Sequence, residues 1–134
     1  MKIKEITSYC GFDSETTGLD AHNDKILEYG VIRVRNNEIV DTFRVLANHK
    51  VFIPQFLTDI HGITTEMCEK EGIDPKEACQ KTMEFIGDDV VVGLNNVAFD
   101  YQFLEVECNR HGLPRPQIEK WFDIGTWHKE FQTI

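Results

Sequence analysis

Short runs of alternating or continuous apolar residues predict five strands. The first run and the hairpin after it are rich in β-branched and aromatic residues, whereas the fourth strand is wholly apolar, as a buried central strand would be. Within the hairpin, Asn36-Asn37 supply the turn, because asparagine tolerates a positive φ. The predicted strands are "ITSYCGF" (6–12), the two arms of the hairpin (26–47), "VVVG" (90–93) and "IEKWFD" (118–123).

Apolar residues at helical spacing predict three helices, at 74–87, 98–112 and 124–134, and Pro54 opens a short helical turn before them. The first helix has complete boundary signals: a capping aspartate, a proline, a capping-box glutamate and a final glycine, at Asp74, Pro75, Glu77 and Gly87. The second buries an apolar stripe and stops at Gly112; the stripe is Phe99, Phe103, Leu104 and Val106. Strands that precede and alternate with helices predict an α/β class with one central sheet.

Length and charge limit the function classes. The 134 residues are enough for one domain, predicted over 1–134, and too few for two. The formal net charge of −9 argues against a broad basic surface for nucleic acid. An enzyme that grips phosphates through bound cations stays compatible with this charge, because acidic sites attract such metals. On charge alone we favour the simpler interpretation, that the charge keeps the protein soluble.

The four cysteines, Cys10, Cys68, Cys79 and Cys108, form no C-x-x-C pair and have no zinc-ligand spacing. They suit small apolar positions in a reducing compartment better than a disulfide framework. The sequence shows neither a signal peptide's apolar core nor a run of transmembrane length. We therefore predict a cytoplasmic protein that has no membrane partner.

Three carboxylates are candidates for a metal site. Asp13 and Glu15, at i and i+2 where the first strand ends, point the same way on an extended chain and repel each other unless a cation lies between them. Asp100 stands in the first turn of the helix that follows "VVVG" and would reach the same edge of the sheet if the two strands are neighbours. Solvated acids at a strand end, and an acid placed for the helix dipole, are the simpler alternatives.

These residues also carry a resemblance to a known family. "FDSETTGLD" is similar to the first motif, F-D-x-E-T-T-G, of the DEDD (DnaQ-like) 3′–5′ exonucleases, a group that includes the proofreading epsilon subunit of DNA polymerase III. "NNVAFDYQFL" resembles the second motif, H-N-x-x-F-D-x-x-F-L, and "IHGIT" (60–64) and "WFDIGTW" resemble two further signatures. The motifs occur in the family's order and span about residues 7–131.

The resemblance implies a ribonuclease-H-like fold, a five-stranded mixed sheet flanked by helices. It implies a metal-dependent exonuclease that uses two divalent cations, Mg²⁺ or Mn²⁺, to hydrolyse phosphodiester bonds and release nucleoside monophosphates. Carboxylates are suitable hard ligands for these ions. Asp13 would bridge the metals, Glu15 would hold one, and Asp100 would serve the second, directly or through water.

The resemblance also assigns substrate-binding residues. Thr16, Thr17 and Gly18 match the turn that touches the terminal nucleotide, where a glycine permits close approach of the backbone, and Leu19 matches a wedge against the last base. His61, Asn96 and Phe99 match a histidine, a polar position and an aromatic that can stack on a base. A core role for Phe99 and a turn role for His61 remain the alternatives. The implied substrate is a single-stranded or frayed 3′ end of DNA, with RNA not excluded, and the implied partners are a DNA polymerase or a second copy of the chain.

The sequence departs from the family in its last motif, H-x-x-x-x-D or Y-x-x-x-D, which supplies a fourth carboxylate and a histidine base. Neither pattern occurs after residue 100: at the required spacings Pro116 follows His111, Thr133 follows His128 and Glu105 follows Tyr101. Asn95 also replaces the histidine that often precedes Asn96. Because general-base help contributes about 10²–10⁴-fold in rate, we expect weak or no activity from this chain alone.

Three accounts of this departure remain open. The chain is a piece of a longer exonuclease, a short form without catalysis, or a chain completed by a second copy through domain swapping. The fold would then lack the family's final helices. Two further functions stay as alternatives: a non-catalytic module that binds nucleic acid or a partner on the same fold, and an α/β protein with an unrelated metal site.

Overall fold

The computed structural model describes residues 7–94 and 96–123. Its sheet is mixed, with the strand order β3-β2-β1-β4-β5. Strand β1 pairs antiparallel with β2 and parallel with β4, so it lies at the centre. The five strands are β1 (Tyr9–Thr16), β2 (Ile26–Arg35), β3 (Glu38–Leu46), β4 (Val91–Gly93) and β5 (Trp121–Asp123).

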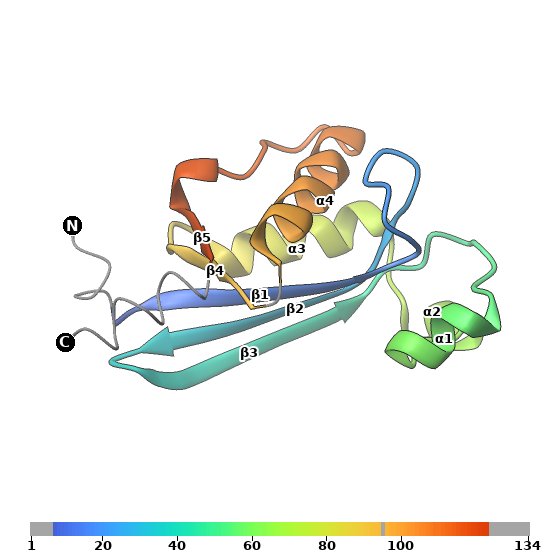
Figure 1. The fold of residues 1–134 in the computed structure, drawn as a ribbon, viewed down its shortest axis with the longest axis horizontal. Helices are drawn as coiled ribbons and strands as arrows, with labels where there is room; N and C mark the ends of the chain where they lie inside the picture. Colours follow the sequence, from blue (N-terminus) through green and yellow to red (C-terminus); the bar gives the residue numbers. More distant parts are fainter. Residues whose placement is uncertain (1–6, 95, 124–134) are drawn as a thin grey trace.

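The helices occupy two places around this sheet (Figure 1). The longer two, α3 and α4, pack on one face, whereas the short α1 and α2 lie beyond one end of the long strands. The four helices are α1 (Gln55–His61), α2 (Thr65–Glu71), α3 (Pro75–Ile86) and α4 (Val97–Arg110), and a 3-10 turn (Ile118–Lys120) precedes β5. No helix among the described residues is long and apolar enough to cross a membrane.

Two of the three hydrophobic clusters among the described residues join the helices to the sheet. The main core lies under α3 and α4, where the ring of Phe12 meets Tyr29 and Trp121 edge-on, with ring centroids 6.5 and 5.2 Å away. A smaller core of Leu27, Leu46, Ile53, Ile63 and Cys68 joins the ends of β2 and β3 to α1 and α2. The second core therefore anchors the segment that carries His61 to the sheet.

Most of the predicted elements are confirmed. The hairpin turns at Asn36 and Asn37, which have φ of 52° and 64°, and Asp74 caps α3 by accepting a hydrogen bond from the Glu77 amide. The prediction was wrong in three places: β1 runs on to Thr16, α2 was not expected, and the strand predicted at 118–123 is a 3-10 turn followed by a shorter strand. The helix predicted at 124–134 lies outside the described residues.

The four cysteines are free and buried, as the sequence predicted, and three of them lie in helices. The Sγ atoms of Cys79 and Cys108 are 3.7 Å apart between α3 and α4. Burial raises the pKa of Cys10 to about 12, with help from its hydrogen bond to Asp89. The thiols thus serve as small core side chains in the described structure.

Candidate active site

The carboxylates lie where β1 outruns its parallel neighbour. Strand β4 pairs with β1 only as far as Phe12, opposite Gly93, so within 7–94 and 96–123 no strand pairs with the residues that follow Phe12 on that side. Asp13 and Glu15 occupy this free stretch and pair with β2, where they stand opposite Gly30 and Glu28. The strand therefore carries both acids to the edge of the sheet while β2 holds their backbone.

Helix α4 brings in the third acid by a close approach at Gly93. A Cβ on Gly93 would lie 2.7 Å from Val97, so only glycine lets the first turn of α4 fold back against β4. Asn96 caps this helix by accepting a hydrogen bond from the Phe99 amide. Asp100 thereby reaches β1, where the Ser14 hydroxyl donates a 2.6 Å hydrogen bond to its Oδ1.

Asp100 is a buried carboxylate whose second oxygen has no partner. Its residue is 2% exposed, and Oδ2 accepts no hydrogen bond from the described residues. Burial raises the pKa of Asp100 to about 6, the Ser14 hydroxyl opposes this, and Asp13 and Glu15 add to it by repulsion. Burial also raises the pKa of Glu15, and its neighbours Asp13 and Glu28 add to the effect.

Carboxylate oxygens are the donor type that a hard divalent cation prefers. A cation would satisfy Asp100 Oδ2 and remove the repulsion that raises these pKa values. Within the described part of the chain, however, no three acidic, histidine or cysteine side chains already surround one point as metal ligands would. Asp13, Glu15 and Asp100 are therefore electrostatic neighbours that are not gathered around a common centre.

A groove of about 680 Å³ opens beside the acids. All seven predicted substrate residues line the groove together with Asp13 and Glu15. These seven are Thr16, Thr17, Gly18, Leu19, His61, Asn96 and Phe99. Asp100 is absent from its lining and lies buried behind Ser14.

His61 presents one unpaired nitrogen in this groove. Its Nδ1 accepts a hydrogen bond from the Ile63 amide, so the neutral ring carries its proton on Nε2. This bond to the backbone is the one predicted by the alternative in which His61 stabilises a turn. That Nε2 is buried without a partner among the described residues. Burial lowers the pKa of His61, against a raising effect of Glu28, and favours the neutral ring. His61 can thus donate one hydrogen bond to a ligand.

The turn after β1 is held by its own side chains. Thr16 donates to the Gly18 carbonyl, and Thr17 donates to Asp24 Oδ1. A Cβ on Gly18 would lie 2.3 Å from Asp24 Oδ2, so any larger residue at position 18 would clash with the Asp24 carboxylate. Close approach of the Gly18 backbone to a nucleotide, which the family resemblance implies, stays a prediction.

Apolar side chains form the rest of the groove. Leu19 is 87% exposed, and Phe56 and Ile60 of α1 are 65% and 76% exposed. Phe99 packs on Phe103 with ring centroids 4.6 Å apart and still lines the groove, so it combines the core and ligand-facing roles. Phe56 and Ile60 were missed from the sequence; their i, i+4 spacing just before His61 is the pattern that could have indicated them.

A family model described as exonuclease (RNase_T) matches residues 10–132. The chain belongs to this exonuclease family. The family resemblance inferred from the carboxylate motifs is confirmed. The predicted ribonuclease-H-like sheet is confirmed as well.

Curated relatives of this exonuclease-family chain are PolC-type DNA polymerases III. That of Clostridium perfringens is 42% identical over 98 residues, which are 72% of this chain and 7% of that protein. That of Bacillus subtilis is 35% identical over 105 residues, 78% of this chain and 7% of that protein. The chain thus spans less than a tenth of the length of these relatives.

Solved structures of Exonuclease I share the fold. The enzyme of Methylocaldum szegediense matches with a TM-score of 0.73 at 22% identity, over 88% of this chain and 27% of that one. A zinc-bound complex of the E. coli enzyme with single-stranded DNA matches with a TM-score of 0.74 at 16% identity, over 89% and 28%. At these identities the match establishes the arrangement of strands and helices.

Proposed function

We propose that this exonuclease-family domain hydrolyses the 3′ end of a DNA strand with two divalent cations, Mg²⁺ or Mn²⁺, held by Asp13, Glu15 and Asp100. The observation that carries the proposal is Asp100 Oδ2, a buried acceptor without a partner beside two further carboxylates. Bound cations would supply an activated water and stabilise charge on the scissile phosphate. The shared fold and the family match support the same reaction class.

The chain's own residues have distinct roles in this proposal. Ser14 orients Asp100 by holding Oδ1, which leaves Oδ2 for a cation. The Nε2 proton of His61, which has no partner among the described residues, would bind an oxygen of the terminal nucleotide. The apolar side of the groove would receive its base, with Phe99 as a stacking surface and Leu19 as a wedge.

The substrate and partner come from the relatives. The relatives named above are DNA polymerases, and E. coli Exonuclease I has been solved in complex with a dT13 oligonucleotide. We therefore propose DNA as the substrate and a DNA polymerase as the functional setting, in the cytoplasm. The fourth carboxylate and the general base are not assigned to any of the described residues.

A non-catalytic nucleic-acid-binding module is the second candidate. It is favoured by one observation, that the described carboxylates do not converge on a common centre. Both candidates predict that a strand binds in the groove, and they differ in whether a metal then leads to cleavage.

Cleavage of a 3′-labelled single strand, measured while Mg²⁺ or Mn²⁺ is titrated, separates the two. We expect slow, metal-dependent release of the labelled mononucleotide, since no described residue supplies the fourth carboxylate or the general base. Asp13→Asn should lower this rate by about 100-fold or more, because loss of a residue that only supports a metal ligand already costs about 10–100-fold. Asp88→Asn, a change in a fully exposed side chain, is the matched control and should keep the wild-type rate. Binding without cleavage at any metal concentration would instead establish the module.

A further inference from the structure

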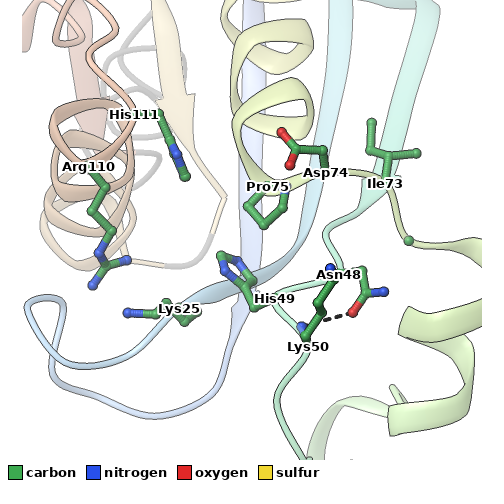
Figure 2. Close-up of a pocket in the computed structure, with 10 residues that line it drawn as sticks. Lys25, Asn48, His49, Lys50, Ile73, Asp74, Pro75, Arg110 and His111 are labelled. Atoms are coloured by element: carbon green, nitrogen blue, oxygen red, sulfur yellow. Dashed lines mark hydrogen bonds between the residues drawn. The ribbon is translucent and has the colours of Figure 1, made fainter.

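A second pocket, of about 470 Å³, is lined by Lys25 and by residues of three other segments (Figure 2). It shares the 17–25 loop with the carboxylate groove. Asp24 lines the groove, and its neighbour Lys25 lines this pocket. The loop after β3, the start of α3 and the end of α4 form its other walls. Its charged and titratable lining residues are Lys25, His49, Lys50, Asp74, Arg110 and His111, and we call it the basic pocket.

Two ammonium groups in the basic pocket are uncompensated. The side chains of Lys25 and Lys50 form no ion pair or hydrogen bond with the residues in 7–94 and 96–123, although the whole chain carries a net charge of −9. Asp74 is the one carboxylate in the lining, and it accepts the hydrogen bond from the Glu77 amide that caps α3. The pocket therefore keeps positive charge in an acidic protein.

The guanidinium of Arg110, the third cation of the basic pocket, is held by residues outside the pocket lining. Glu107, which is fully buried, pairs with Arg110 Nη1 and lies 3.3 Å from His111 Nε2. Arg110 Nη2 donates to the carbonyls of Ala21, His22 and Asp24. Arg110 is thus held in one position and its charge is offset by Glu107. The ammonium groups of Lys25 and Lys50 are therefore the cations available to bind a ligand.

The imidazole ring of His49 is a titratable group in the lining of the same pocket. Its Nε2 donates a 2.8 Å hydrogen bond to the Ile26 carbonyl, so Nδ1 is the atom left for a ligand. Burial lowers the pKa of His49; Lys25 and Arg110 lower it further, while Glu107 and the bond to Ile26 raise it. An anion in the pocket would favour the protonated ring, which then donates from both nitrogens.

We propose that the basic pocket binds a backbone phosphate of the same DNA strand whose 3′ end occupies the carboxylate groove. The proposal rests on the proposed function, because that function places a strand next to the 17–25 loop. Lysine ammonium groups bind phosphates as point charges, and each such contact releases counterions. The basic pocket would thus provide an attractive electrostatic contact between an acidic protein and its polyanionic substrate.

The test compares strand lengths in the presence of a chelator, so that nothing is cut. Fluorescence anisotropy measures the affinity for a dinucleotide and for a strand of about 12 nucleotides, within the range of single-strand sites. We expect Lys25→Ala/Lys50→Ala to bind the long strand about tenfold more weakly and to lower the slope of log affinity against log salt by about one to two. Its affinity for the dinucleotide should equal that of the wild type.

Lys70→Ala/Arg115→Ala removes the same charge from two exposed positions outside the basic pocket and is the matched control. An equal loss in this control, or unchanged affinity of the pocket variant for the long strand, overturns the proposal. A third outcome also overturns the proposal: inorganic phosphate shifts the His49 ring resonances, while the affinity for DNA does not depend on strand length. The basic pocket would then be a site for free phosphate. A wild type that binds the strand but never cleaves it would contradict the proposed hydrolysis and leave this comparison intact.

Discussion

At the scale of single residues, two buried polar atoms distinguish the candidate site from the rest of the described structure. Asp100 Oδ2 and His61 Nε2 are two of the three buried side-chain atoms that lack a partner there. An unsatisfied buried group costs about 1–3 kcal/mol, and such a cost is commonly kept where a ligand removes it. One atom is an acceptor suited to a cation and the other a donor suited to a phosphate or base.

The raised pKa of Asp100 predicts how the metal-free protein responds to pH. The pKa of Asp100 in the folded protein, about 6, exceeds the ordinary value of 3.8, so the folded state binds the proton more tightly than the unfolded chain. The resulting stability is fully present below pH 3.8 and is lost as the pH rises through 6. Asp100→Asn cannot ionise and should be more stable than the wild type at pH 7.5, by about 1–3 kcal/mol.

Urea unfolding in a chelator, at pH 4 and pH 7.5, measures this difference. The advantage of Asp100→Asn over the wild type should grow between the two values, whereas Asp88→Asn should show no such growth. An advantage of the same size at both pH values would mean that ionisation of Asp100 is not its cause.

The residue scale also shows what a sequence can and cannot reveal about a site. Asp13, Glu15, Asp100 and Phe99 could be predicted as site residues because they stand in local motifs. Ser14 was missed: strand alternation turns it away from both neighbouring acids, and its partner Asp100 lies 86 residues along the chain. A contact over that separation leaves no periodic pattern in the sequence.

At the scale of elements, local chemistry again decides what was predictable. Helix α3 and the Asn36-Asn37 turn were found because their caps and backbone preferences lie within a few residues. Helix α2 was missed, although Thr64 caps it by accepting from the Met67 amide, since seven residues contain too few turns to show a period. Strand β1 outran its prediction because pairing with β2, which no local pattern reports, continues to Thr16.

The junction between β4 and α4 yields a prediction at this scale. Gly93→Ala would place a Cβ 2.7 Å from Val97 and push the start of α4 away from the sheet, at a cost of about 1–3 kcal/mol. Because α4 carries Asp100, cleavage should fall as well. Thermal unfolding and the cleavage assay measure the two effects.

Gly30→Ala in β2 is the matched control, because its Cβ would meet only the Asp13 carbonyl, at 3.7 Å. This variant should fold and cleave like the wild type. Equal stability of the two alanine variants would show that α4 does not depend on the close approach at Gly93.

At the scale of the whole molecule, one buried ion pair joins the helical layer to the groove. The pattern of α4 predicted its apolar stripe, yet Glu107 is fully buried in the same helix and Val106 of the stripe is only half-buried. Glu107 holds Arg110, and Arg110 bonds three carbonyls of the 17–25 loop. The loop that carries Leu19 at the groove is therefore positioned from the far end of α4.

Arg110→Lys tests this long-range support while keeping the charge. A single ammonium cannot reproduce the planar fork that serves Glu107 and three carbonyls at once, so the loop should loosen. Amide exchange at residues 20–25 should accelerate, and KM for the strand should rise more than kcat falls, because binding depends on the loop and the carboxylates stay in place. Arg115→Lys, at a 79% exposed side chain, should change neither quantity. Unaltered exchange in Arg110→Lys would mean that the hydrogen bonds of Thr16, Thr17 and Asp24 hold the loop without help from α4.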